Sequence, residues 1–272
     1  MMILNIDKLE LACSTDEANR EYISQQECLD FQFFYMVKNT NESNYKIKFD
    51  IFMEDGKLYG NLYFGSYNFN RQRIYLSINN EIFYNGNLGL IDYIIDSLNL
   101  EFHSISKLDL ALDFDSNIIN TFYKLLKMDE LSPIILNRKY DMQCKEIKNL
   151  INVSTGSRKN VRKFKSFYIT NKERGLCLNA YDKTKEIADN DYQKQYIIDK
   201  LDMKKIFRLE IRTNHTLLLD SIKKLGYTDD YLYDLIVTNQ IHELFELYKH
   251  LLNRLIRFDF KGKVISFLDL LM

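Results

Sequence analysis

The chain of 272 residues is 46% hydrophobic and 28% charged, which predicts a folded protein with a substantial core and excludes an intrinsically disordered one. Its net charge of −1 argues against a protein whose whole surface binds nucleic acid. Nearly equal numbers of acidic and basic residues still permit local basic patches. No apolar run approaches the roughly 18 residues of a membrane span, and the N-terminus lacks a signal-peptide pattern. We therefore expect a cytoplasmic protein that does not contact the membrane.

The cysteines and histidines do not form a recognisable motif. The four cysteines lie far apart without a CxxC pair, so the pattern indicates neither a disulfide framework nor a zinc knuckle. The four histidines include no HxH pair. Any metal in this chain would be held mainly by carboxylates, which favours magnesium or manganese over zinc.

The first hundred residues predict an antiparallel sheet. A helix is expected at 15–27, and the strands that follow are rich in aromatic and β-branched residues: FQFFYMVKN, YKIKFDIFM, KLYGNLYFGS and RIYLSIN. Glu54-Asp55-Gly56 is a hairpin signal between the second and third of these strands. Asn87 is a candidate cap for a helix over 88–100, whose apolar residues recur at helical spacing.

Later elements alternate between helices and strands. Helices are predicted at 117–128, 187–201 and 216–225, with one long amphipathic helix near 233–257. Strands are predicted at 106–114, 150–154, 166–186 (a hairpin) and 204–213, whereas 130–149 is ambiguous.

The strand at 106–114 has a clean division between its faces. Leucine and phenylalanine line one face, and the other carries three acids around a small alanine: Asp109, Ala111, Asp113 and Asp115. Aspartate is poor in strand interiors and like charges repel. Such a face is either simply solvated or uses its acids to hold a cation.

The hairpin at 166–186 presents a tyrosine beside a cation. Its turn has glycine at the tip, Gly175, and along its second strand Cys177, Asn179, Tyr181 and Lys183 share the polar face. A tyrosine with a neighbouring cation and carboxylates within reach is a candidate nucleophile for a phosphodiester. The alternative is that Tyr181 is one of 19 tyrosines and fills a half-buried sheet.

The strand at 204–213 alternates in the same way, with Arg208, Glu210 and Arg212 on its polar face. Nearby positive charge keeps a carboxylate ionised, and arginines bind phosphate oxygens in bidentate fashion. The alternative is a cross-strand ladder of ion pairs. If the three strands are neighbours, one surface gathers Asp109, Asp113, Tyr181, Lys183 and Glu210.

At these residues the chain resembles the replication initiation proteins of rolling-circle plasmids of the staphylococcal tetracycline-plasmid type, together with related conjugative-element relaxases and replication initiation factors. The resemblance covers roughly 107–213 in three patches. The family pattern R-x-D-x-A-x-D is met by Lys107, Asp109, Ala111 and Asp113, with lysine in place of arginine. The pattern R-x-Y-x-K-x-x-E is met by Tyr181, Lys183 and Glu186, and R-x-E by Arg208 and Glu210. Asn179 stands where arginine is usual, and Thr170-Asn171 replaces a Gly-Ser turn.

The shared alternation of the three strands, apolar on one face and polar on the other, predicts an α+β fold with an antiparallel-rich central sheet and helices on one face, the apolar one. The resemblance implies one replication-initiator domain over 1–272, with a β-rich half at about 28–100, a catalytic half at about 101–214 and a helical part at 215–272. The implied activity is metal-dependent nicking and rejoining of origin DNA through a 5′-phosphotyrosine, with Tyr181 as nucleophile and Lys183 beside it. Mg²⁺ or Mn²⁺ would be held by Asp109 and Glu210, with Asp113 or Glu186 as the third ligand.

The expected partner is origin DNA, single-stranded or in a hairpin. A homodimer and contacts with a host helicase and polymerase are further expectations. The cations expected to contact DNA comprise a basic run before the hairpin, two turn residues and two strand arginines: Arg158, Lys159, Arg162, Lys163, Lys165, Lys172, Arg174, Arg208 and Arg212. For the basic run, the alternative is a solvated loop. For the whole chain, the alternatives are a conjugative relaxase and a non-catalytic DNA-binding descendant of the same fold.

Overall fold

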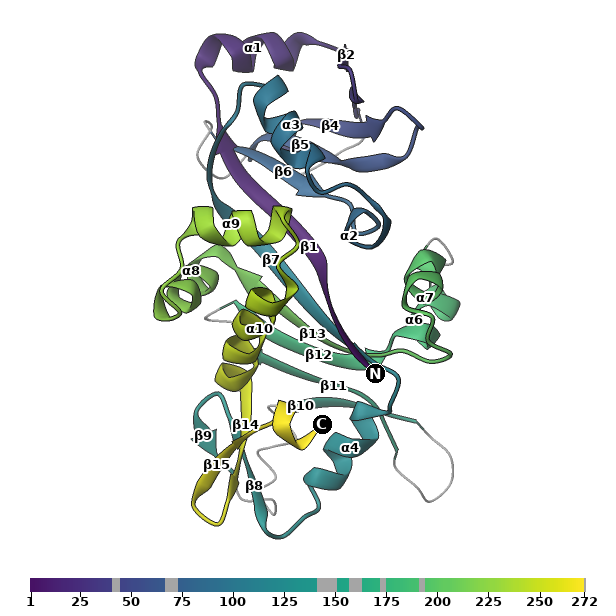
Figure 1. Ribbon diagram of the computed structural model, residues 1–272, viewed down its shortest axis with the longest axis vertical. Coiled ribbons are helices and arrows are strands. Elements are labelled where there is room, and N and C mark those ends of the chain that lie inside the picture. Colours follow the sequence, from purple (N-terminus) through teal and green to yellow (C-terminus); the bar gives the residue numbers. More distant parts are fainter. Residues whose placement is uncertain are drawn as a thin grey trace. The chain divides into compact units, whose positions relative to one another are not determined.

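The computed structural model describes residues 1–40, 45–66, 73–140, 151–156, 163–171, 175–190 and 194–271, which form two compact units (Figure 1). Unit 1 comprises residues 1–5, 109–226 and 240–272, and unit 2 comprises residues 6–108 and 227–239. Two long strands, β1 (Met2–Ser14) and β7 (Glu101–Phe114), contribute residues to both units. The expectation of a single domain over 1–272 stays a prediction.

The main sheet of unit 1 brings together the three strands that carry the sequence motifs. Its strand order is β10 (Ile151–Gly156), β11 (Lys163–Asn171), β12 (Leu176–Asp182), β13 (Phe207–Asn214), β7 and β1, as Figure 1 shows. From β10 to β13, each strand pairs with the next strand along the chain in antiparallel orientation. The predicted α+β class with an antiparallel-rich sheet is therefore confirmed.

Helices cover the apolar face of this sheet. The helices α4 (Ile118–Leu125), α8 (His215–Lys224) and α10 (Ile241–Leu255) pack against β11, β12 and β13. The buried side chains of α10 recur every three or four residues, which is the spacing of one helix face: Leu244, Leu247, Tyr248, Leu251, Leu252 and Leu255. The Tyr248 hydroxyl donates to the Leu209 carbonyl at 2.8 Å, and burial raises the pKa of Tyr248 well above its ordinary value. This tyrosine therefore stays protonated and links α10 to β13.

The predicted long helix near 233–257 is instead two helices. The helix α9 (Asp229–Val237) belongs to unit 2 and ends at Val237, and Asn239 follows it with a positive φ of 55°, a conformation that asparagine tolerates better than most residues. After α10, the chain forms a hairpin of β14 (Ile256–Phe260) and β15 (Lys263–Ser266). This hairpin joins β8 (Leu131–Ile135) and β9 (Arg138–Lys139) in a four-stranded sheet. The prediction of one helix was wrong because the helix breaks at 238–240, between α9 and α10.

Unit 1 is completed by α6 (Lys183–Asn190), α7 (Gln195–Leu201) and a short 3₁₀ helix, η2 (Leu268–Leu270). Unit 2 pairs the strand β1 with the predicted N-terminal strands. They are β6 (Ile74–Ile78), β5 (Leu58–Ser66), β4 (Tyr45–Met53), β3 (Phe34–Lys38) and β2 (Cys28–Asp30), in this spatial order. Its helices are α1 (Glu17–Gln25), α2 (Ile82–Asn85), α3 (Leu90–Ser97) and α9.

Two details of unit 2 bear on the sequence predictions. The expected hairpin turn between β4 and β5 is confirmed, with Gly56 at a φ of +79°. Asn87 does not cap α3 directly, because its side-chain oxygen accepts from Gly89 and no side-chain hydrogen bond caps the helix. Across the described ranges of both units, no helix has the length and apolar character needed to cross a membrane.

Gly175, at the end of the hairpin turn before β12, should resist substitution. It has a φ of +65°, and a Cβ there would lie 2.0 Å from Nδ2 of Asn214, whose Oδ1 caps α8 by accepting from the Leu217 amide at 3.0 Å. We expect Gly175→Ala to cost about 2 kcal/mol, from the left-handed backbone and the disturbed cap. Urea unfolding measures this cost. Gly56→Ala is the matched control, because its φ is similar but a Cβ meets nothing within 4 Å, so it should cost about 1 kcal/mol. Equal costs would contradict the role of Asn214.

Candidate functional site

The polar face of the β11–β12–β13 sheet is built from residues in register. Asn179 on β12 lies opposite Tyr168 on one side and Glu210 on the other, and Tyr181 lies opposite Arg208. On this face, a side chain reaches both its direct partner and the diagonal neighbour two residues along. Tyr181 can therefore approach Glu210 as well as Arg208.

The Tyr181 hydroxyl contacts its diagonal neighbour, Glu210. It donates a hydrogen bond to Oε2 of Glu210 at 2.8 Å, and Nε of Arg212 binds the other carboxylate oxygen, Oε1, at 2.5 Å. The Glu210 side chain is only 1% exposed, whereas the Arg212 side chain is 54% exposed. The carboxylate is thus a buried acceptor that holds the phenol on one side and an accessible guanidinium on the other.

Arg212 stays charged in this setting. Burial lowers the pKa of its guanidinium, but the hydrogen bond to Glu210 and the negative charges of Glu210 and Asp109 raise it, and the net direction is upward. Asp113 of β7 pairs with Arg208 of β13, and the two strands are neighbours in the sheet. Of the residues expected on one surface, Tyr181 and Glu210 are in direct contact.

Lys183 has a different position from the predicted one. The strand β12 ends at Asp182, whose side chain accepts from the Lys185 amide at 2.9 Å in the manner of a helix cap, and Lys183 is the first residue of α6. The prediction that Lys183 continues the polar face of the strand is therefore wrong. Its ammonium nevertheless lies 5.7 Å from the centre of the Tyr181 ring, and it pairs with Glu186 at 2.8 Å one turn along the helix. The Lys183 side chain is 2% exposed.

A buried ion pair lies directly beside Tyr181. Arg208 binds Asp113 through two parallel hydrogen bonds of 2.8 Å, both side chains are 0% exposed, and Asn5 of β1 donates to Oδ2 of Asp113 at 3.0 Å. A fully buried guanidinium held by a carboxylate cannot reach DNA phosphates. The structure thus contradicts the prediction that Arg208 contacts DNA. The Arg208 guanidinium also occupies both carboxylate oxygens of Asp113, which was a predicted metal ligand.

The predicted metal ligands do not meet as one group. Glu210 is held by Tyr181 and Arg212, Asp113 by Arg208 and Asn5, and Glu186 by Lys183. Within the described part of the chain, no three acidic, cysteine or histidine side chains are placed to hold a metal ion. As arranged, these carboxylates neutralise cations of the protein and do not fit a ready-made metal site.

Most of the cations that were expected to contact DNA, from the basic run and the hairpin turn, lie outside the described residues. Arg158, Lys159, Arg162, Lys172 and Arg174 fall there, and only the backbone of Lys163 is described, at the start of β11. Lys165 is exposed on the same strand, and Arg212 is exposed on β13, where it binds the carboxylate that also accepts from Tyr181. The DNA-binding role of these residues stays a prediction.

One residue of the site was not anticipated. Asn5 was missed because the N-terminus was not expected to form a strand, although Leu4 and Ile6 alternate with it and are buried, which is the signal of a strand. Tyr168 lies on the same face, and its hydrogen bond with Cys177 is the main cause that raises its pKa. Tyr168 is therefore a phenol on the candidate surface that is harder to ionise than usual.

The comparisons with known proteins address the fold. No family model matches the chain, and no curated protein matches it in sequence. Among solved structures, the chain is similar to the rolling circle replication initiator protein from Geobacillus stearothermophilus, with a TM-score of 0.51 and 14% identity over 94% of this chain and 86% of that chain. At this identity the likeness concerns the fold and does not assign roles to residues. The chain thus shares its fold, at a distant level, with a rolling circle replication initiator.

Proposed function

We propose that this chain is a replication initiator that nicks and rejoins one strand of origin DNA through a covalent bond to Tyr181. The observation that carries the proposal is the hydrogen bond from the Tyr181 hydroxyl to the buried carboxylate of Glu210 at 2.8 Å. A nucleophile bonded to a base, which is itself oriented by a third group, is the arrangement that activates hydroxyl nucleophiles. Here Arg212 is the third group. The fold likeness to a rolling circle replication initiator supports the same function.

The chemistry follows from these contacts. As the phenol oxygen attacks the phosphorus, Glu210 accepts its proton, and the bond from phosphorus to the 3′ oxygen breaks. The 3′ oxygen takes up a proton from water and leaves as a hydroxyl, and the 5′ phosphate stays on Tyr181. The reverse reaction rejoins the strand, because the phosphotyrosine keeps the energy of the broken phosphodiester. A free 3′ hydroxyl is the primer that a polymerase needs, which is why a host polymerase and helicase are proposed partners.

The electrostatic surroundings suit a phosphodiester. Arg212 uses Nε for Glu210, and its remaining N–H groups are available to a phosphate oxygen on the exposed side. The Lys183 ammonium lies 5.7 Å from the centre of the Tyr181 ring and is buried, so its positive charge favours negative charge on the phenol oxygen. We propose that Arg212 holds the scissile phosphate and that Lys183 stabilises the developing phenolate.

The general-base role of Glu210 predicts a specific loss. Glu210→Gln keeps an oxygen acceptor for Tyr181 but removes the proton acceptor, so we expect nicking to fall about 10²- to 10⁴-fold. DNA binding should change less than about threefold, because Arg212 loses one partner but stays in place. Rates of nicking and a binding isotherm on the same oligonucleotide measure the two effects. Glu186→Gln is the matched control, since Glu186 pairs with Lys183 on α6 and not with the phenol. Equal losses in both variants would contradict the assignment.

The function itself is tested with the wild-type protein and a supercoiled plasmid that carries the DNA flanking its gene. Open circles that retain protein after denaturation are the expected product. Reactions with Mg²⁺, with Mn²⁺ and with a chelator determine whether the predicted metal is needed. Retained protein in none of these reactions, despite site-specific binding, would contradict the nicking proposal.

A non-catalytic DNA-binding protein is the second candidate. The observation that favours it is the engagement of Asp113, Glu186 and Glu210 by protein cations, which leaves no set of three acids for a metal among the described residues. Binding of the flanking DNA without a covalent product is the outcome that would select it. A homodimer and a cytoplasmic location are proposed with either function.

A further inference from the structure

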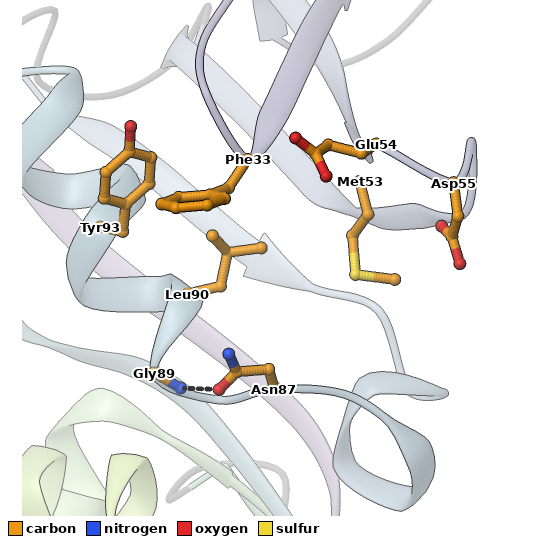
Figure 2. A pocket seen from close by; sticks show the side chains of 8 residues that line it. All are labelled: Phe33, Met53, Glu54, Asp55, Asn87, Gly89, Leu90 and Tyr93. Atoms are coloured by element: carbon orange, nitrogen blue, oxygen red, sulfur yellow. Dashed lines mark hydrogen bonds between the residues drawn. The ribbon is translucent and has the colours of Figure 1, made fainter.

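Unit 2 contains a pocket of about 460 Å³, formed by three segments that meet around an aromatic pair (Figure 2). The segments are the residues before β3, the tip of the β4–β5 hairpin and the start of α3, and the lining residues are Phe33, Met53, Glu54, Asp55, Asn87, Gly89, Leu90 and Tyr93. The volume falls within the range of about 300–1,000 Å³ that is typical of pockets for small ligands. No role in the proposed nicking reaction is assigned to any of these residues.

The pocket has an apolar, aromatic lining. Phe33 is 46% exposed, which is unusual for a large apolar side chain, and its ring packs against Tyr93 with centroids 5.0 Å apart in an edge-to-face geometry. In Figure 2, Leu90 lies next to Phe33 and Met53 lines the other side of the same space. An exposed phenyl ring in a pocket offers a stacking surface to a planar group.

The acids at the rim differ in their partners. Asp55 pairs with Lys57 at 2.9 Å, and this contact lowers the pKa of Asp55. Glu54 is exposed, and no described residue forms an ion pair with it. Figure 2 shows the Glu54 carboxylate on the Phe33 side of the pocket, whereas the Asp55 carboxylate lies farther away. Within the described part of unit 2, the pocket thus combines a carboxylate that has no ion-pair partner with an aromatic face.

We propose that this pocket binds an arginine side chain carried by a segment of a partner protein. A guanidinium stacks on an aromatic ring and forms parallel hydrogen bonds with a carboxylate, so Phe33 and Glu54 match its two recognition modes. The methylene stem of arginine is apolar and fits against Leu90 and Met53. DNA is disfavoured as the occupant, because the carboxylates at the rim repel phosphates. This inference is independent of the proposed nicking reaction.

The probe is the peptide acetyl-Leu-Arg-Leu-amide, added to the full chain labelled with ¹³C at its methionine methyl groups. Met53 lines the pocket and reports occupancy, and Met53→Leu identifies its signal. We expect the Met53 signal to shift in a saturable manner while the other methionine signals stay in place. The same peptide with citrulline, a neutral isostere, or with lysine should bind about tenfold more weakly.

Two exposed positions provide matched variants. Glu54→Gln should weaken binding of the arginine peptide about tenfold, whereas Asp55→Asn should change it less than about twofold, because Lys57 already neutralises Asp55. Both changes lie on the hairpin tip, and unchanged signals of the other methionines show that the fold is intact. A Met53 signal that does not move, or equal binding of the arginine and citrulline peptides, would overturn the proposal.

Discussion

Tyr181→Phe is expected to abolish nicking and the covalent adduct while DNA binding stays within about threefold of wild type. The substitution removes only the attacking oxygen, so no phosphotyrosine can form. Stability should fall by no more than about 1–2 kcal/mol, because one partly buried hydrogen bond to Glu210 is lost and the ring is kept. Denaturing gels of the reaction with 5′-labelled DNA and urea unfolding measure the two effects.

Tyr168→Phe is the matched control for the nucleophile. Tyr168 lies on the same polar face, opposite Asn179, and its raised pKa makes it a poorer source of a phenolate. Nicking by this variant should stay within about threefold of wild type, since no step is assigned to it. An active Tyr181→Phe variant together with an inactive Tyr168→Phe variant would move the nucleophile to β11.

The largest expected effect on stability comes from the buried pair beside the site. Asp113→Ala leaves the guanidinium of Arg208 uncompensated in a position that is 0% exposed, which should cost about 3–5 kcal/mol. Urea unfolding at pH 7 measures the loss. Should this variant fail to fold, Asn5→Ala gives a milder test, because it removes one hydrogen bond to Asp113 and should cost about 1 kcal/mol.

Two controls test whether the loss of stability comes from the burial of this ion pair or from the removal of any charged side chain. Asp189→Ala removes an exposed partner of Lys185 on α6, where the side chains are 59% and 58% exposed, and should change stability by less than about 1 kcal/mol. The double variant Arg208→Met with Asp113→Leu replaces the pair by apolar side chains and should recover most of the loss. A loss for Asp113→Ala no larger than that for Asp189→Ala would contradict the structural role of the pair.

Periodicity explains why the central strands could be predicted from the sequence. Apolar residues alternate along 107–114, 176–180 and 207–211, so the two faces of each strand are separated before any pairing is known. The adjacency of β12, β13 and β7 is confirmed by the strand order of the sheet, and their polar residues share one face because the side chains alternate. Tyr181 and Glu210 were expected on one surface for this reason.

The partners of the charged residues could not be predicted in the same way. Alternation assigns Arg208 and Arg212 to one face, but only the register decides that Arg208 meets Asp113 in the interior while Arg212 remains half exposed. Lys183 was placed on the strand because the period of two continues through it. The cap at Asp182 instead starts a helix there and directs the lysine to Glu186.

The central claim, that Tyr181 is the nucleophile, is tested most directly by mapping the covalent adduct. The wild-type protein is reacted with origin DNA, digested with nuclease and protease, and the peptide that carries the residual nucleotide is sequenced by mass spectrometry. We predict a single modified residue, Tyr181, in a peptide that spans β12. A nucleotide on Tyr168 or on any other residue would contradict the account.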